Sequence, residues 1–149
     1  PILQGMGKNI VHCGSGGLGQ ATKICNNMLA GINALAAAEA MTMGERLGVS
    51  PDTLYEVIST STGRSYIFET SNPMPDVCST SPANNKFKPG FMAKLMLKDL
   101  RLSQAAAQDA KTSTPLGAAA TAAFQQLIDS GFGDLDTSSI IKVIKPESK

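Results

Sequence analysis

Apolar residues recur at helical spacing along a proline-free stretch near the start of the chain. Residues 19–47 are rich in Ala, Leu, Met and Glu, which are strong helix formers, and apolar residues such as Ile24, Met28 and Ile32 return every four positions. Gly48 follows directly and is typical of the residue that ends a helix. The pattern therefore predicts one long helix over residues 19–47.

Two hydroxyl–proline pairs predict the starts of shorter helices. Ser50 precedes Pro51 and Thr114 precedes Pro115, so each pair places a capping side chain before a proline at the first helical position. The helices predicted after the long one cover residues 51–59, 61–70, 91–111, 115–131 and 136–144. In the helix predicted over residues 91–111, four apolar residues fall on one side: Phe91, Leu95, Leu102 and Ala106.

Two segments break the helical pattern. Residues 72–90 carry four prolines and are expected to form a long loop, and long ordered loops in compact domains are often functional. The run over residues 8–13, around Ile10 and Val11, is typical of a short strand, but no partner strand follows it. We therefore expect an all-α fold preceded by one orphan strand, whose sheet lies in sequence outside this chain.

Composition is consistent with one globular domain of 149 residues. The chain is 42% hydrophobic and 17% charged, so it has enough apolar side chains for a packed core. Its 13 basic and 12 acidic side chains give a net charge of +1, and we expect no nucleic-acid partner. No apolar run is long enough to span a membrane, so no membrane partner is expected. Three scattered cysteines and a single histidine predict no metal site.

The segment from Gly14 to Gly19 contains a literal G-x-G-x-x-G. A dinucleotide fingerprint also needs a second strand that ends in an acidic residue about 20 positions later. Glu39 stands at that distance but lies inside the predicted long helix. A phosphate-binding P-loop is excluded as well, because Gln20 stands where that motif has lysine. We infer that this loop is not itself a dinucleotide site.

Lys23 and Asn27 follow the glycines and share one helix face, four residues apart. The glycines let a small ligand approach the backbone, and a lysine in the first turn lies near the positive end of the helix dipole. A lysine there can act as a general acid or base, while an asparagine can orient a hydroxyl or carbonyl group. The alternative is that both side chains are solvated surface residues of a non-catalytic helical dimerisation module, in which the glycines only permit close packing.

The spacing Gly14-x-x-Gly17-x-Gly19-x-x-x-Lys23-x-x-x-Asn27 resembles the signature of the β-hydroxyacid dehydrogenases. The resemblance covers essentially the whole chain. Within that family, the segments "KICNNML", "SNPMPDV", "PANN" and "GFMAKLMLKDLRLSQAA" are most similar to the C-terminal part of the 3-hydroxyisobutyrate dehydrogenases.

This resemblance implies the C-terminal part of a two-domain enzyme. Residues 1–14 would be the last strand and loop of an N-terminal Rossmann domain that binds NAD. Residues 15–149 would form a multi-helical substrate and dimerisation domain of the 6-phosphogluconate dehydrogenase type. The implied partners are a small hydroxyacid substrate and further copies in a homodimer or homotetramer. The implied location is mitochondrial in a eukaryote and cytoplasmic otherwise.

The resemblance also assigns roles to individual residues. Lys23 is similar to the catalytic base of the family, and Asn27 and Gly17 to its substrate-binding residues. Lys98 and Phe91 resemble residues that contact the cofactor. One departure is Tyr66, where close relatives often carry Trp, and it concerns the shape of the substrate pocket. Tartronate semialdehyde or succinic semialdehyde reductases would share these residues, so related hydroxyacids remain alternative substrates.

Overall fold

The computed structural model describes residue 5 and residues 7–145, and within them the fold is helical, as predicted. The elements are α1 (Leu18–Arg46), α2 (Pro51–Ser59), α3 (Tyr66–Thr70), the 3-10 turn η2 (Pro82–Asn85), α4 (Ala93–Asp109), α5 (Pro115–Asp129), the 3-10 turn η3 (Thr137–Ile140) and α6 (Ile141–Ile144). Among the described residues the only β pairing is an isolated bridge between Met92 and Asp136. No helix in this part of the chain combines the length and apolarity that a membrane span requires.

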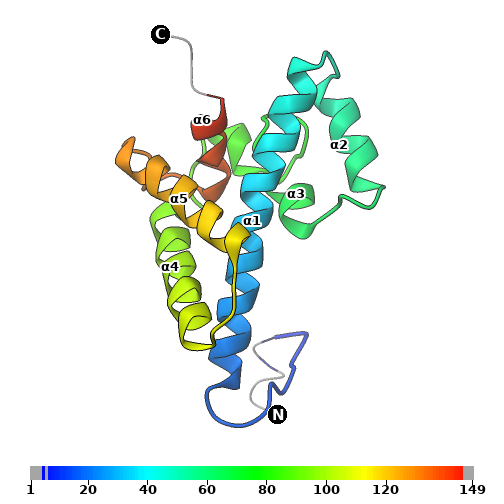
Figure 1. Ribbon diagram of the computed structural model, residues 1–149. Coiled ribbons are helices and arrows are strands. Elements are labelled where there is room, and N and C mark those ends of the chain that lie inside the picture. Colours follow the sequence, from blue (N-terminus) through cyan, green and yellow to red (C-terminus); the bar gives the residue numbers. More distant parts are fainter. Residues whose placement is uncertain (1–4, 6, 146–149) are drawn as a thin grey trace.

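Helix α1 is the axis of the molecule, with α4 and α5 packed on one side and α2 and α3 on the other (Figure 1). Its predicted end is confirmed. Gly48 adopts a left-handed φ of 90°, its N–H donates to the carbonyl of Glu45 at 3.0 Å, and the N–H of Val49 donates to the carbonyl of Gly44 at 3.1 Å. A residue with a Cβ would be strained at this φ, so glycine is the natural stop.

Small side chains let the helices approach closely in the core. Ala34, Ala37 and Ala38 of α1 are buried. At Gly31 a Cβ would lie 2.9 Å from a methyl carbon of Leu100, so the missing side chain is what allows α4 to lie against α1. Larger apolar residues from all the long elements fill the rest of the core, among them Met41, Met96, Phe124, Leu127 and Ile140.

Only one of the two predicted hydroxyl caps forms. Ser50 Oγ accepts a hydrogen bond from the N–H of Thr53 at 3.2 Å and caps α2. Thr114 precedes α5 but makes no capping bond, because its hydroxyl instead donates to Oε1 of Gln104 on α4 at 3.2 Å. Proline at the first helical position therefore starts α5 without a side-chain cap.

The apolar side predicted for α4 is not its buried face. Leu95 and Leu102 are 39% and 50% exposed, and Phe91, which precedes the helix, is 37% exposed. The buried face of α4 instead carries Ala93, Met96, Leu97, Asp99, Leu100 and Ser103. The face of α4 that packs against the core therefore includes the carboxylate of Asp99 and the hydroxyl of Ser103, while the apolar side chains of Leu95 and Leu102 remain partly exposed on the surface.

The strand predicted over residues 8–13 is not formed. This segment is exposed and irregular, since no other part of the described chain offers it a partner for strand hydrogen bonds. The predicted boundary between residues 14 and 15 falls just before α1. Residues 1–4, 6 and 146–149, which belong to the two predicted domains, lie outside the described residues.

Candidate functional site

Lys23 and Asn27 lie one turn apart on α1 and line the same small cavity, of about 100 Å³. Lys23 is exposed and Asn27 is half-buried. The other residues that line the cavity come from α1 and α4: Gln20, Ile24, Lys98, Asp99 and Leu102. The packing of α4 against α1 thus brings Lys98, predicted to contact the cofactor, to the side chains predicted for catalysis and substrate binding.

Lys23 is the sixth residue of α1, so it lies in the second turn and not in the first as the sequence suggested. The helix begins one residue earlier than expected, at Leu18, with Gly17 as its N-cap at a φ of 92°. The helix dipole acts mainly on the first turn. The surroundings of Lys23 are therefore set more by the neighbouring side chains of α4 than by the end of its own helix.

Asp99 connects two of the predicted site residues. Its Oδ2 accepts a hydrogen bond from Nδ2 of Asn27 at 2.7 Å, and its Oδ1 lies 3.0 Å from Nζ of Lys98. Asp99 itself is 7% exposed. A buried carboxylate is stable only when donors satisfy it, and both of its oxygens are satisfied here by site residues.

Asp99 was not predicted to be a site residue, although its position in the sequence indicated that it would be buried. Its position falls on the same helical stripe as Met96, Leu100 and Ser103, all of which are buried. A charged residue on a buried stripe needs a partner, and this requirement distinguishes it from the surface charge that a Lys-Asp pair usually indicates.

The contact with Asp99 fixes the orientation of the Asn27 amide. A carboxylate only accepts hydrogen bonds, so Asn27 must turn its NH₂ group toward Asp99. Its Oδ1 then points away from Asp99 and accepts a hydrogen bond from Nδ2 of the exposed Asn26 at 3.2 Å. Asn27 therefore presents a carbonyl oxygen in a fixed direction, as a residue that orients a hydroxyl group requires.

Two lysines give this small cavity its electrostatic character. The side chain of Lys98 is 59% exposed, and the contact with Asp99 uses only one of its three N–H donors. Lys23 is also exposed. The carboxylate of Asp99 offsets one of these two positive charges, so the cavity favours an anionic ligand such as a carboxylate or a phosphate.

Phe91 lies at a second, larger cavity that shares Asn27 with the first. This cavity measures about 510 Å³, and Tyr66, Met96 and Thr70 also line it. The backbone holds Phe91 in place, because the N–H groups of Gly90 and Phe91 donate to Oδ2 of Asp136 at 3.0 and 2.9 Å. The structure therefore does not place Phe91 beside Lys23 and Lys98, and connects it to them only through Asn27.

Tyr66 and Gly17 stand at the edges of this region. Tyr66, the position at which this chain departs from the family pattern, is 78% exposed at the larger cavity. Gly17 lines neither cavity, and its carbonyl accepts hydrogen bonds from the N–H groups of Gln20 and Ala21 at 3.0 and 3.1 Å. Within the described residues, Gly17 acts as the start of α1.

Tyr55 and Cys78 form a hydrogen-bonded pair with shifted pKa values. Burial raises the pKa of Tyr55, and its hydrogen bond to Cys78 adds to this effect. Burial also opposes ionisation of Cys78, but hydrogen bonds from Thr80 and Tyr55 hold the pKa of the thiol below its ordinary value. Tyr55 Oη and Cys78 Sγ both donate to the carbonyl of Glu69, at 2.8 and 2.9 Å. The pair ties α2 to the loop that follows α3.

Among the described residues, no group of three or more His, Cys, Asp or Glu side chains is arranged to hold a metal ion.

Comparisons with known proteins agree with this architecture. Residues 17–144 match the family model described as "NAD-binding of NADP-dependent 3-hydroxyisobutyrate dehydrogenase", so the chain belongs to this family. It is 40% identical over 146 residues to the mitochondrial 3-hydroxyisobutyrate dehydrogenase of Drosophila melanogaster, covering 98% of this chain and 45% of that protein. It is 39% identical to an NAD-dependent L-serine dehydrogenase of Pseudomonas aeruginosa, covering 98% of this chain and 49% of that protein.

Solved structures of relatives share the fold. A structure titled as Mycobacterium tuberculosis 3-hydroxyisobutyrate dehydrogenase with L-serine aligns with a TM-score of 0.91 at 41% identity, over 97% of this chain and 50% of that one. A Salmonella typhimurium 3-hydroxyisobutyrate dehydrogenase aligns with a TM-score of 0.83 at 30% identity, over 95% and 48% of the two chains. The chain thus spans about half the length of the relatives it matches. The resemblance predicted from the glycine, lysine and asparagine spacing is confirmed.

Proposed function

We propose that this chain is the helical C-terminal part of an NAD-dependent 3-hydroxyisobutyrate dehydrogenase. The enzyme would transfer a hydride from 3-hydroxyisobutyrate to NAD and yield methylmalonate semialdehyde, a step of valine catabolism. Residues 15–149 would form the substrate and dimerisation domain, and residues 1–14 would be the last strand and loop of an N-terminal Rossmann domain. The observation that supports this proposal best is the grouping of Lys23, Asn27 and Lys98 around the carboxylate of Asp99.

Each of these residues has a separate role in the proposed reaction. Lys23 acts as the general base, and its neutral amine takes the proton of the substrate hydroxyl as the C–H bond gives up its hydride. In the reverse direction the same ammonium returns the proton to the carbonyl oxygen. Asn27 orients the substrate through the amide that Asp99 holds, and Gly17 keeps the backbone before Lys23 free of side chains. Asp99 is a positioning residue, because it acts through Asn27 and Lys98.

The cofactor is assigned to Lys98 at the small cavity and to Phe91 at the larger cavity, which share Asn27. Lys98 fits an anionic group, because its ammonium is mostly exposed and keeps two N–H donors that Asp99 does not use. Phe91 fits a flat ring, because it is partly exposed at a cavity and held there by its backbone. When bound, NAD supplies the acceptor for the hydride. We assign the dinucleotide-binding loop, and with it the choice between NAD and NADP, to the N-terminal domain.

L-Serine is the second candidate substrate. One relative is named an NAD-dependent L-serine dehydrogenase, and one solved relative is described as a 3-hydroxyisobutyrate dehydrogenase with L-serine. Serine is also a β-hydroxyacid, so Lys23 and Asn27 would act in the same way. It differs by carrying an ammonium group where 3-hydroxyisobutyrate has a methyl group. Among the residues that line the cavity, the one carboxylate, Asp99, already accepts from Asn27 and Lys98, so it offers little to a further ammonium group. This favours 3-hydroxyisobutyrate.

Exposed apolar side chains on three of the helices support the proposal that this domain has partners. Leu29, Leu102 and Leu116 are 56%, 50% and 67% exposed on α1, α4 and α5. Such residues usually become covered when they cluster. We assign this surface to the N-terminal domain and to a second copy in a homodimer or homotetramer. A mitochondrial location is expected in a eukaryote, as for the relatives named mitochondrial, and a cytoplasmic one otherwise.

The test is NAD reduction by the full-length protein with 3-hydroxyisobutyrate, L-serine, glycerate and 4-hydroxybutyrate as substrates. Lys23→Ala should lower kcat by roughly 10²–10⁴-fold, the usual contribution of a general base. Lys94→Ala is the matched control, because Lys94 is an exposed lysine of α4 whose ion pair with Asp134 lies on the surface. Equal turnover of the two variants would refute the role of Lys23. Activity with another hydroxyacid alone would keep the mechanism and change the substrate.

A further inference from the structure

An apolar seam runs along the half of α1 that lies far from Lys23. It consists of Ala36, Ala40, Met43 and Leu47, which follow one another at spacings of four, three and four residues. These alternating spacings are the a and d positions of a heptad repeat, at which one helix packs along another in a coiled coil. Figure 1 shows this half of α1 between α6 and α2. The repeat therefore indicates a face that suits a further helix.

The seam is exposed on the surface of the domain. Met43 is 62% exposed, and Leu47, which directly follows the last residue of α1, is 74% exposed. The four seam residues and Ile144 of α6 line a groove of about 560 Å³. The core lies on the other side of α1, where Ala34, Ala38 and Met41 are buried. Contiguous apolar surface of this kind is typical of a protein interface.

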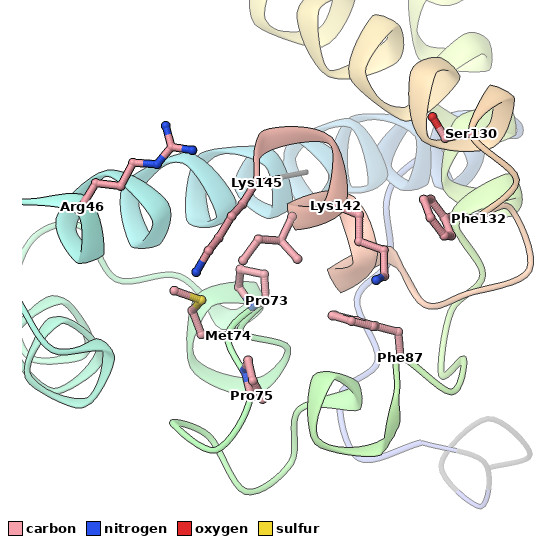
Figure 2. Close-up of a pocket in the computed structure, with 10 residues that line it drawn as sticks. Arg46, Pro73, Met74, Pro75, Phe87, Ser130, Phe132, Lys142 and Lys145 are labelled. Carbon is pink, nitrogen blue, oxygen red and sulfur yellow. The ribbon is translucent and has the colours of Figure 1, made fainter. Parts of the chain in front are cut away.

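Two opposite charges flank the seam on the same side. Glu39 and Arg46 both line the groove, and both are exposed. Neither has an ion-pair partner within the described part of the chain. Figure 2 shows that the side chain of Arg46 points away from Pro73 and Met74. Both charges are therefore available to a partner that lies in the groove.

Two copies of the seam are complementary in shape when they run antiparallel. If Ala40 of one copy faces Met43 of the other, then Ala36 of the first copy also faces Leu47 of the second. Each layer then sets a small side chain against a large one, which fills the space between two helices evenly. A parallel pair would instead set Met43 against Met43 and Ala36 against Ala36, so its layers would differ in width.

The same antiparallel register also pairs the flanking charges. Glu39 and Arg46 each stand one residue before an a position, Ala40 and Leu47, so both are g positions of the heptad. Reversing one helix exchanges its two flanks, so the g side of each copy faces the g side of the other. Glu39 of one copy then lies opposite Arg46 of the other, and two-fold symmetry forms this pair twice.

A parallel pair would leave these charges without partners. In that arrangement the g side of one helix faces the e side of the other. The e positions of this seam are Ala37 and Gly44, which are buried and carry no charge. The charges therefore favour the antiparallel arrangement, as the alternation of small and large side chains does.

We propose that the seam is an interface with a second copy of this chain, in which the two α1 helices lie antiparallel and Glu39 and Arg46 form two intermolecular ion pairs. This contact rests on the homodimer or homotetramer of the proposed function, and it is separate from the exposed leucines described above. The N-terminal domain would join α1 at its other end, since Leu18 lies about 27 Å along the helix axis from Ala36. A second copy therefore fits this end of α1 better than that domain does.

The test is sedimentation velocity of the full-length protein over a series of concentrations. Glu39→Arg sets positive charges against each other across the seam, and Arg46→Glu sets negative charges against each other. Either variant alone should weaken this association by at least tenfold, so its assembly should lose the copies that the seam holds. Glu56→Arg and Arg64→Glu make the same changes at exposed residues outside the groove, and these matched controls should keep the wild-type mass.

Restoring the charge pairs tests the antiparallel register. An equimolar mixture of the Glu39→Arg and Arg46→Glu proteins should regain the wild-type mass, because each chain carries the charges that the other needs. The double variant Glu39→Arg/Arg46→Glu should regain it as well, since both pairs are reversed together. A variant that had merely lost its fold would not be restored by mixing.

Three results would overturn the proposal. They are a wild-type protein that sediments as a monomer, single variants that keep the wild-type mass at every concentration, and single variants whose mass neither the mixture nor the double variant restores. The measurement needs no substrate, so it is independent of the proposed reaction. A wild-type protein that assembles as expected but does not oxidise 3-hydroxyisobutyrate would refute the proposed reaction and leave this interface in place.

Discussion

Replacing Asp99 with Asn is predicted to loosen the contact that holds Asn27 in place. The substitution keeps the size of the side chain but removes its charge and replaces one acceptor oxygen with an NH₂ group. Both neighbours of Asp99 are donors, Nδ2 of Asn27 at 2.7 Å and Nζ of Lys98 at 3.0 Å. An asparagine can therefore satisfy only one of them, and its own NH₂ group faces the other.

The magnitude follows from the burial of the two contacts. The bond between Asn27 and Asp99 is partly buried and charge-assisted, and such bonds contribute about 1.5–3 kcal/mol. The pair between Lys98 and Asp99 involves a lysine that is 59% exposed, so solvent screening limits it to about 0–1 kcal/mol. Asp99→Asn should therefore lower the free energy of unfolding by about 1–3 kcal/mol, with most of the loss on the Asn27 side.

The assay is urea unfolding of the full-length protein, with Asp109→Asn as the matched control. Asp109 is the last residue of α4 and is exposed, so the same chemical change should cost little there. A double-mutant cycle with Asn27→Ala should give a coupling energy of about 1 kcal/mol or more between Asn27 and Asp99. In activity assays Asp99→Asn should lower kcat and raise the KM for NAD, whereas Lys98→Met should change mainly the KM for NAD.

Two results would refute this reasoning. The first is an Asp99→Asn protein that unfolds within about 0.5 kcal/mol of the Asp109→Asn control, which is the usual effect of a neutral surface change. The second is a coupling energy near zero between Asn27 and Asp99. Either would mean that the contact does not hold the Asn27 amide and that Asp99 is not a positioning residue.

Three further predictions concern the scaffold. Gly31→Leu should destabilise the protein by about 1–3 kcal/mol, because even a Cβ would lie 2.9 Å from a methyl carbon of Leu100 and α4 would have to move; unchanged thermal unfolding would contradict the close packing. Ser50→Ala should cost about 1 kcal/mol in urea unfolding, since it leaves the N–H of Thr53 without its cap, and a loss near zero would mean that Pro51 alone starts α2. Burial raises the pKa of Tyr55, so the folded state holds the phenol proton more tightly than the unfolded state does. The contribution of Tyr55 to stability should therefore be complete below about pH 10 and fall as the pH rises further. Tyr55→Phe should remove this decline in the free energy of unfolding, and an identical decline in that variant would assign it to other groups.

Much of the helical fold could be predicted from short-range sequence signals. Strong helix formers, the positive-φ glycine at position 48 and the serine at position 50 act within a few residues of chain, so α1 and the start of α2 were predicted to within about a residue. Where a local signal competed with a distant partner, the prediction was wrong. Thr114 was expected to cap α5, but Gln104 on another helix takes its hydroxyl.

The faces of the helices depended on tertiary packing. Periodicity placed Phe91, Leu95 and Leu102 on one side of α4, but it does not show which side meets the core. The strand predicted over residues 8–13 is not formed within the described residues, because a strand exists only when another strand supplies hydrogen bonds, and its sheet was expected outside this chain.

The sequence by itself determined where the four longest helices lie, that Lys23 and Asn27 share a helix face, and, through the glycine, lysine and asparagine spacing, the family. It did so because helix formation and four-residue spacing depend on neighbours in the chain. Only the tertiary structure decided that Asp99 joins Asn27 to Lys98, and that Phe91 lies at a different cavity. Residues 27 and 99 are brought together by the packing of α1 against α4, and the approach of such distant residues depends on the whole core.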